Sequence, residues 1–263
     1  MLASLAQRSF LPPSSLLALF AAGLLLSWGS EAFAYRPFDG TDAAVADPGE
    51  TEVELQPAGA QWSREQQNLL IAPAVVYNYG FLKDWEAVLE SQLQTPFSPS
   101  GPTSLSASAV SLKHVIRPGS LQDQSGPSIA AEFGVLLPDS NGDNRFGATI
   151  DAIVSQRWDG GTVHVNNAAE LTRDQRADVF TDLIIEGPSK WVVRPVAEFF
   201  YEEEFGRAHT LSGLIGAIWQ VNDKLSFDVG FRHAVTNGSN VNEIRAGLTV
   251  GFMTPFGRLD QKR

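Results

Sequence analysis

The chain of 263 residues contains no cysteine and only four histidines. Without cysteine there are no disulfides, thiolate metal sites or cysteine nucleophiles. The histidines show no metal-ligand spacing, so we expect neither a metal nor a cofactor. Cationic side chains are also scarce, because 19 lysines and arginines stand against 30 aspartates and glutamates, which gives a net charge of −11. This balance argues against nucleic acid as a partner, since phosphates must be neutralised by Lys and Arg.

The sequence also lacks the long apolar runs of a helical membrane protein. Its mean hydropathy is −0.07, a value that still permits a barrel in which only alternate residues face lipid. One apolar run, residues 16–28, falls short of the roughly 20 residues that a membrane-spanning helix needs. It follows a weakly positive start and precedes the small residues Ala32 and Ala34, as at a signal-peptidase site. We therefore expect residues 1–34 to be a Sec signal peptide; an uncleaved anchor is the alternative.

What the sequence does contain is alternation, which is clearest near its end. Residues 225–231 place apolar side chains at every second position, and residues 243–252 repeat the pattern beyond Asn237 and Gly238. Successive strand residues point to opposite faces of a sheet, so each arm has one apolar face and one polar or small face. Asn-Gly is a typical hairpin turn. The pattern predicts an antiparallel hairpin that is apolar on one side.

Twelve segments of this kind follow one another from residue 51, with no convincing helical period between them. Four tight connections, near residues 82–84, 159–161, 187–190 and 222–224, fall after even-numbered segments, whereas 118–126 is too long for this pattern. An even number of antiparallel strands behind a signal peptide is typical of outer-membrane barrels.

We predict an all-β fold, a single antiparallel up-and-down transmembrane β-barrel of about 12 strands, over residues 51–253. A soluble sandwich is the alternative. Residues 35–50 would form a periplasmic N-terminal segment, and residues 254–263 would form a C-terminal tail. The barrel would lie in the outer membrane, in contact with its lipid.

Aromatic residues gather near the tight connections. Amphipathic rings settle at the membrane–water boundary, so a band of them at one barrel end predicts a girdle. The expected girdle residues are Tyr79, Trp85, Trp158, Trp191, Trp219 and Phe252.

Charged residues occupy the polar face of the predicted strands. They would be costly against lipid, so we expect them to line the lumen. This set contains Glu86, Glu90, Glu132, Asp151, Asp178, Asp182, Glu186, Arg194, Glu198, Asp228, Arg232, Glu243 and Arg245. They would form either a polar, cation-preferring pathway or a salt-bridged plug that fills the barrel. Eight strands leave room only for side chains and sixteen leave a channel, so about twelve strands permit both arrangements.

Two regions carry a resemblance to a known family. Arg36-Pro37-Phe38 and Pro48-Gly49-Glu50, together with the closing motifs Gly230-Phe231-Arg232 and Gly247-Leu248-Thr249, resemble the outer-membrane proteins named for the meta-cleavage pathway of phenol degradation. The resemblance implies an outer-membrane barrel that takes up aromatic or hydrophobic compounds and has no catalytic residues. Such barrels usually end at the aromatic residue that the barrel-assembly machinery recognises. Here that residue, Phe252, would act ahead of the tail.

These observations favour a barrel that passes or binds small-molecule solutes passively, without enzymatic activity. One alternative is a sealed barrel with a structural or surface role. Another is a membrane-embedded hydrolase that uses Ser212 and His209, although no wider sequence pattern supports that pair.

Overall fold

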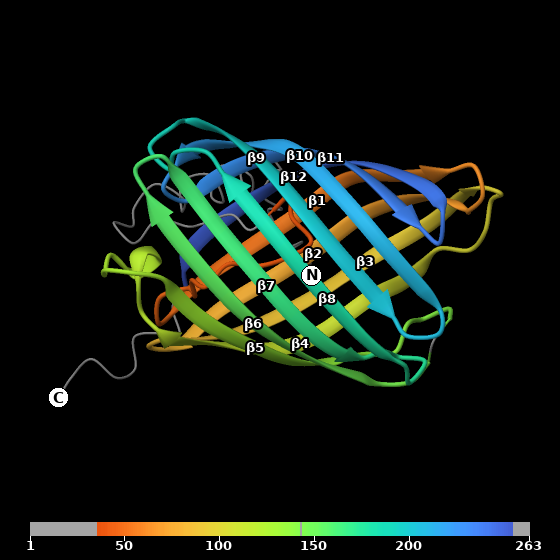
Figure 1. The fold of residues 1–263 in the computed structure, drawn as a ribbon, viewed down its shortest axis with the longest axis horizontal. Helices are drawn as coiled ribbons and strands as arrows, with labels where there is room; N and C mark the ends of the chain where they lie inside the picture. The colour runs from red at the N-terminus through yellow and green to blue at the C-terminus, as the bar shows by residue number, and fades with distance from the viewer. Residues whose placement is uncertain (1–35, 143, 255–263) are drawn as a thin grey trace, which may run out of the picture.

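The computed structural model describes residues 36–142 and 144–254, which form a closed barrel of antiparallel strands (Figure 1). Each strand pairs with its neighbours in sequence, and β1 pairs with β12 to close the ring. The strands are β1 (Glu50–Ser63), β2 (Asn68–Leu82), β3 (Trp85–Ser98), β4 (Ser104–Arg117), β5 (Ser128–Leu136), β6 (Gly147–Trp158), β7 (Gly161–Leu171), β8 (Ala177–Glu186), β9 (Val193–Glu204), β10 (Ala208–Asn222), β11 (Leu225–Thr236) and β12 (Ser239–Met253).

The predicted twelve-stranded, all-β barrel is therefore confirmed, and a sandwich of two separate sheets is excluded because the ring is closed. The predicted signal peptide lies outside the described residues, as does the tail after Thr254. Within the part of the chain that the structure describes, no helix is long and apolar enough to cross a bilayer.

The two ends of the barrel differ in what they carry. At one end, which we call the terminal end, β1 begins, β12 ends and the connections after even-numbered strands lie. The opposite end, which we call the loop end, carries the remaining connections. The connection from β4 to β5 is long because it contains a 3₁₀ turn, Ser120–Gln122, whose Leu121 packs into the barrel against Ala130 and Ile153. That packing explains the one connection that did not fit the predicted pattern.

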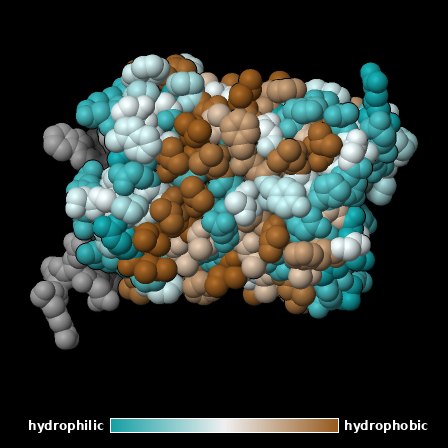
Figure 2. Space-filling model, viewed as in Figure 1, coloured by the Kyte–Doolittle hydropathy of each residue, from teal (hydrophilic) through white to brown (hydrophobic). Residues whose placement is uncertain are grey.

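The outer surface is apolar around the middle of the barrel. Figure 2 shows hydrophobic side chains across the centre of the visible face and hydrophilic ones toward both ends. Large exposed apolar side chains come from many strands, including Leu89, Phe133, Ile150, Leu183, Phe199, Leu211, Ile215, Val229 and Ile244. An apolar band outside and polar residues inside are the arrangement of a membrane-spanning barrel.

Residues 36–49, which we call the inner segment, run inside the barrel without regular structure. The sequence predicted a periplasmic segment over residues 35–50, and the contacts of residues 36–49 place this part of the chain against the inner wall of the barrel. Its backbone N–H groups need acceptors when they leave water. Polar side chains on the lumen wall supply those acceptors, and no local sequence signal reveals such pairings.

Candidate functional site: the barrel lumen

The inner segment makes a circuit of the lumen wall. Its N–H groups donate to acceptors on successive strands around the ring. The pairs are Asp39 and Gly40 with Glu198 of β9 (2.7 and 2.9 Å), Thr41 with Asn166 of β7 (3.1 Å), Ala43 with Ser155 of β6 (2.9 Å), Ala46 with Glu86 of β3 (2.6 Å) and Gly49 with the carbonyl of Gly80 in β2 (2.7 Å). The segment thus follows the inside of the wall until the chain enters β1.

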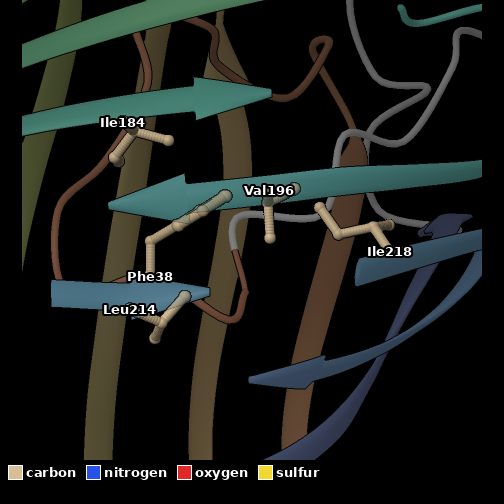
Figure 3. Close-up of a cluster of buried hydrophobic side chains, with 5 residues drawn as sticks. All are labelled: Phe38, Ile184, Val196, Leu214 and Ile218. Atoms are coloured by element: carbon tan, nitrogen blue, oxygen red, sulfur yellow. The ribbon is translucent and has the colours of Figure 1, made fainter. Parts of the chain in front are cut away.

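Phe38 anchors the start of this circuit. Its ring belongs to a buried apolar cluster with Ile184, Val196, Leu214 and Ile218, which come from β8, β9 and β10 (Figure 3). Burying a phenylalanine side chain contributes about 1.5–3 kcal/mol. An apolar cluster inside a polar lumen therefore fixes the inner segment against one side of the wall.

The backbone approaches the wall most closely at Gly40. A Cβ atom placed there would lie 1.9 Å from a carboxylate oxygen of Asp182 and 3.0 Å from the amide nitrogen of Asn166. Asp182 itself accepts a hydrogen bond from Asn166 (3.2 Å) and is buried. Any larger residue at position 40 would push the inner segment away from β7 and β8.

Arg245 of β12 holds the same part of the segment electrostatically. One of its guanidinium nitrogens, Nη2, lies 3.1 Å from both carboxylate oxygens of Asp39, and Nη1 donates to the carbonyl of Pro37 (3.0 Å). Its Nε lies 3.1 Å from Glu243, which also accepts from Arg232 at 2.6 Å. Arg245 and Glu243 are buried and both are paired, which is the condition under which proteins tolerate buried charges.

All thirteen side chains that the sequence assigned to the lumen point inward, and they fall into two groups. Seven pack beside the inner segment or pair with the wall and do not line the cavity: Asp182, Glu186, Arg194, Glu198, Asp228, Glu243 and Arg245. Six line a cavity: Glu86, Glu90, Glu132, Asp151, Asp178 and Arg232. Of these six, Glu86 also accepts from the inner segment and Arg232 also pairs with Glu243. The lumen therefore combines the two arrangements that the sequence left open.

The cavity has a volume of about 1190 Å³ and extends past the inner segment. Its wall includes Lys83 in the connection at the terminal end, Ala44 in the inner segment, and Arg173 in a connection at the loop end. Fifteen carboxylate side chains and six cationic side chains line it. The inner segment narrows this acidic space without filling it.

Several carboxylates on this wall have no partner. Among residues 36–142 and 144–254, no hydrogen bond or ion pair reaches the side chains of Glu90, Glu170, Asp178 or Glu202. Asp178 is only 8% exposed. Unpaired carboxylates around a narrow polar space attract cations into it.

The predicted lumen set omitted a buried cation, Lys113 of β4. Its ammonium donates to the Thr41 hydroxyl (3.0 Å) and lies 3.4 Å from the Asp42 carboxylate. The alternation of β4 is interrupted at Ala107, whose φ of 48° marks an irregularity in the strand. A β-bulge shifts the alternation of a strand by one residue, so simple alternation no longer shows which side chains face inward. Lys113 would have been assigned to the lumen if a bulge had been assumed in β4.

Arg173 was also missed, because it lies in a connection rather than a strand. It donates to the carbonyls of Leu137 (2.6 Å) and Ser108 (2.8 Å) and so ties together the rim at the loop end. In the same connection the Thr172 hydroxyl and Arg176 lower the pKa of Asp174 to about 2.

Comparisons with known proteins agree with this geometry. No family model and no curated protein matches the sequence. Among solved structures, the chain is similar to an outer membrane channel from Pseudomonas putida F1, with a TM-score of 0.58, 9% identity, and 82% of this chain and 100% of that chain covered. It is also similar to the NanC porin (TM-score 0.56, 8% identity, 76% and 98% covered) and to the KdgM porin in complex with disordered oligogalacturonate (TM-score 0.51, 9% identity, 76% and 99% covered). The fold is that of an outer-membrane β-barrel.

The six residues expected in the aromatic girdle all lie at the terminal end of the barrel. Tyr79, Trp85, Trp158, Trp219 and Phe252 occupy outward-facing strand positions, and Trp191 is exposed in the connection between β8 and β9. Trp85 stacks on His114 with ring centroids 4.1 Å apart. Contact of these residues with the membrane surface is part of the proposal below.

Ser212 and His209 do not form a catalytic pair. They lie three residues apart on β10, so the buried Ser212 faces the lumen whereas the exposed His209 faces outward. The hydrolase alternative built on these two residues is therefore contradicted. Within the described part of the chain, no cluster of three His, Asp or Glu side chains has the geometry of a metal site.

Proposed function

We propose that this protein is an outer-membrane channel that passes small polar solutes passively and prefers cations. The observation that carries the proposal is the acidic cavity, which continues past the inner segment from one end of the barrel toward the other. Charges of one sign inside a low-dielectric wall raise the local concentration of the opposite ion. Acidic side chains around a pore select cations in this way.

The location rests on the outer surface of the barrel. The apolar band would contact outer-membrane lipid, and the aromatic residues at the terminal end would lie at the headgroup level on the periplasmic side. Phe252, 39% exposed near the end of β12, would be the residue that the barrel-assembly machinery recognises. Residues 1–34 would direct export through the Sec pathway.

The kind of solute is a finer part of the proposal. The resemblance in the sequence favours aromatic or hydrophobic compounds. The cavity wall is mainly polar, and its aromatic side chains are Phe38, Phe180 and Phe200. A solute that suits this wall carries positive charge in addition to any apolar part.

A sealed barrel with a structural role is the second candidate, favoured by one observation. On β9 to β12 the lumen is occupied by the inner segment and by paired charges such as Arg245 with Asp39. If thermal motion does not widen the remaining space, ions would not pass.

Planar-bilayer recording of the purified full-length protein separates these candidates. With a potassium chloride gradient across the bilayer, we expect single-channel currents whose reversal potential has the sign of a cation-preferring pore. Liposome swelling with neutral sugars of increasing size would measure the width of the path. Absence of both ionic current and solute flux would contradict a channel and favour the sealed barrel.

A further inference from the structure

Two phenylalanines stand on the lumen wall, between the inner segment and the loop end. Phe180 of β8 and Phe200 of β9 both line the cavity, and their ring centroids lie 5.1 Å apart at an interplanar angle of 43°. Elsewhere on the cavity wall the only aromatic ring is that of Phe38, which packs into the apolar cluster. A solute moving through the lumen therefore meets one aromatic surface, to which Phe180 contributes most because Phe200 is only 5% exposed.

Carboxylates surround these rings. In the strand register Phe180 lies opposite Glu202, and on the adjacent strands Asp178 lies opposite Glu170. All three carboxylates line the same cavity, and within the described ranges none has a hydrogen-bond or ion-pair partner. Asp178 is the most enclosed of them, with 92% of its surface buried. A buried carboxylate without a partner is unfavourable, and a bound cation would offset that cost.

Space for a ligand lies beside the rings. The other cross-strand neighbour of Phe180 is Ala168 of β7, whose small side chain also lines the cavity. Two protein cations act on these carboxylates from a distance, without a hydrogen bond or ion pair: Arg232 on Glu202 and Arg173 on Glu170. Neither of them is among the charges that act on Asp178. The guanidinium carbon of Arg232 lies 5.9 Å from the centroid of Phe200, and Glu243 holds that guanidinium at 2.6 Å.

We propose that Phe180, Phe200, Glu170, Asp178 and Glu202 form a subsite for an organic ammonium ion. The face of an aromatic ring carries negative charge density and attracts cations, especially organic ones that have been partly desolvated. The rings contact the apolar body and the near edge of the ammonium group, and the carboxylates supply its counter-charge. An inorganic cation needs only the carboxylates, so the rings are the element that selects an organic one. This subsite rests on the proposed function, since its ligand enters through the lumen.

The test is calorimetric titration of the full-length barrel, folded in detergent micelles, with three probes. Phenethylammonium has both the ring and the charge, ethylammonium has only the charge, and 2-phenylethanol has only the ring. We expect phenethylammonium to bind about tenfold more tightly than either of the others, given the strength of a desolvated cation–aromatic contact. Equal affinity for phenethylammonium and ethylammonium would overturn the subsite.

Single substitutions test which side chains form the subsite. Phe180→Leu and Phe200→Leu keep apolar volume, and each should weaken phenethylammonium binding by about fivefold while leaving ethylammonium unchanged. Asp178→Asn should weaken both amines. The matched control is Glu90→Gln on β3, another unpaired carboxylate of the cavity that lies well away from the rings around the barrel, and it should leave the preference for phenethylammonium intact. If neither leucine variant alters phenethylammonium affinity, the rings are not part of the site.

Because calorimetry does not require current, the outcome is separate from that of the bilayer recording. A barrel that conducts potassium but shows no preference among the three probes would refute the subsite and leave the channel standing. A barrel that does not conduct but binds phenethylammonium selectively would refute the channel and support the subsite. Heat-modifiable migration on SDS gels would show that each variant is folded before it is titrated.

Discussion

Carboxylates that pair with the inner segment or with a cation of the wall and carboxylates that line the cavity without a partner have the same chemistry and different surroundings. Glu198 accepts two backbone N–H groups, and Glu243 is held between Arg232 and Arg245. By contrast, Glu90 and Asp178 have no partner within the described residues. A carboxylate inside a barrel therefore stabilises the fold when it is paired and faces the solute path when it is not.

Among the substitutions considered, loss of Arg245 should have the largest effect on stability, because Arg245 pairs with carboxylates of the first group. In Arg245→Met the carboxylate of Asp39 loses its main counter-charge and the buried Glu243 keeps only Arg232, whereas complete removal of one partner of a buried pair costs about 3–5 kcal/mol. We therefore expect the free energy of unfolding in lipid vesicles, measured by denaturant titration, to fall by about 3 kcal/mol, the lower end of that range. Arg207→Met at the exposed rim is the control and should change it by less than about 1 kcal/mol. Equal effects of the two variants would show that burial does not distinguish them.

A bulkier residue at position 40 would displace the inner segment from the wall at Asp182 and open the lumen there. In Gly40→Ala the added methyl group meets Asp182, and overpacking of this kind costs about 1–3 kcal/mol. Displacement of the inner segment should also widen the path, so we expect single-channel conductance to increase. Gly213→Ala on β10 is a control for loss of glycine, because its Cβ position meets only ordinary contacts of 3.5 Å or more. An unchanged conductance in Gly40→Ala would mean that the inner segment does not limit flow.

Neutralising an unpaired carboxylate should leave stability nearly unchanged and alter ion preference. For Glu90→Gln we expect the free energy of unfolding to stay within about 0.5 kcal/mol of the wild type, because no paired charge is lost. The reversal potential in a potassium chloride gradient should move toward zero, since one attractive charge leaves the path. A stability loss as large as that of Arg245→Met would place Glu90 among the structural carboxylates.

The smallest expected effect concerns Asp174, a paired carboxylate outside the lumen, whose pKa should rise when Thr172 is replaced. The Thr172 hydroxyl and Arg176 lower its pKa to about 2, from an ordinary value near 4. The stabilisation from a depressed pKa is present above the ordinary value and is lost as the pH falls through about 2. A carboxyl-carbon NMR titration should therefore show a midpoint near 2 in the wild type and a higher midpoint in Thr172→Ala. A wild-type midpoint near 4 would mean that the rim pairing is absent in solution.

The strands and their inward faces were predictable because a period of two is a local property of the sequence. Phe227 and Asp228, for example, are assigned to opposite faces by alternation alone. The inner segment was not predictable, because its partners are distant in sequence: Thr41 and Asn166 are 125 residues apart. No local pattern distinguishes a free loop from one that hydrogen-bonds along a barrel wall. For the same reason alternation predicts which side chains face inward but not which of them are paired.

The hydrogen bonds and ion pairs of Arg245 with residues 37–39 should affect how the barrel assembles. Arg245 belongs to β12, which is the last strand to be synthesised, and Asp39 precedes β1. The seam between β1 and β12 and the capture of Asp39 therefore form together, and a barrel that shuts with the inner segment outside would enclose unpaired charge. A time course of heat-modifiable migration should show slower maturation in Arg245→Met than in the wild type. Such a delay would mean that pairing of Arg245 with the residues before β1 helps the last strand to close the ring.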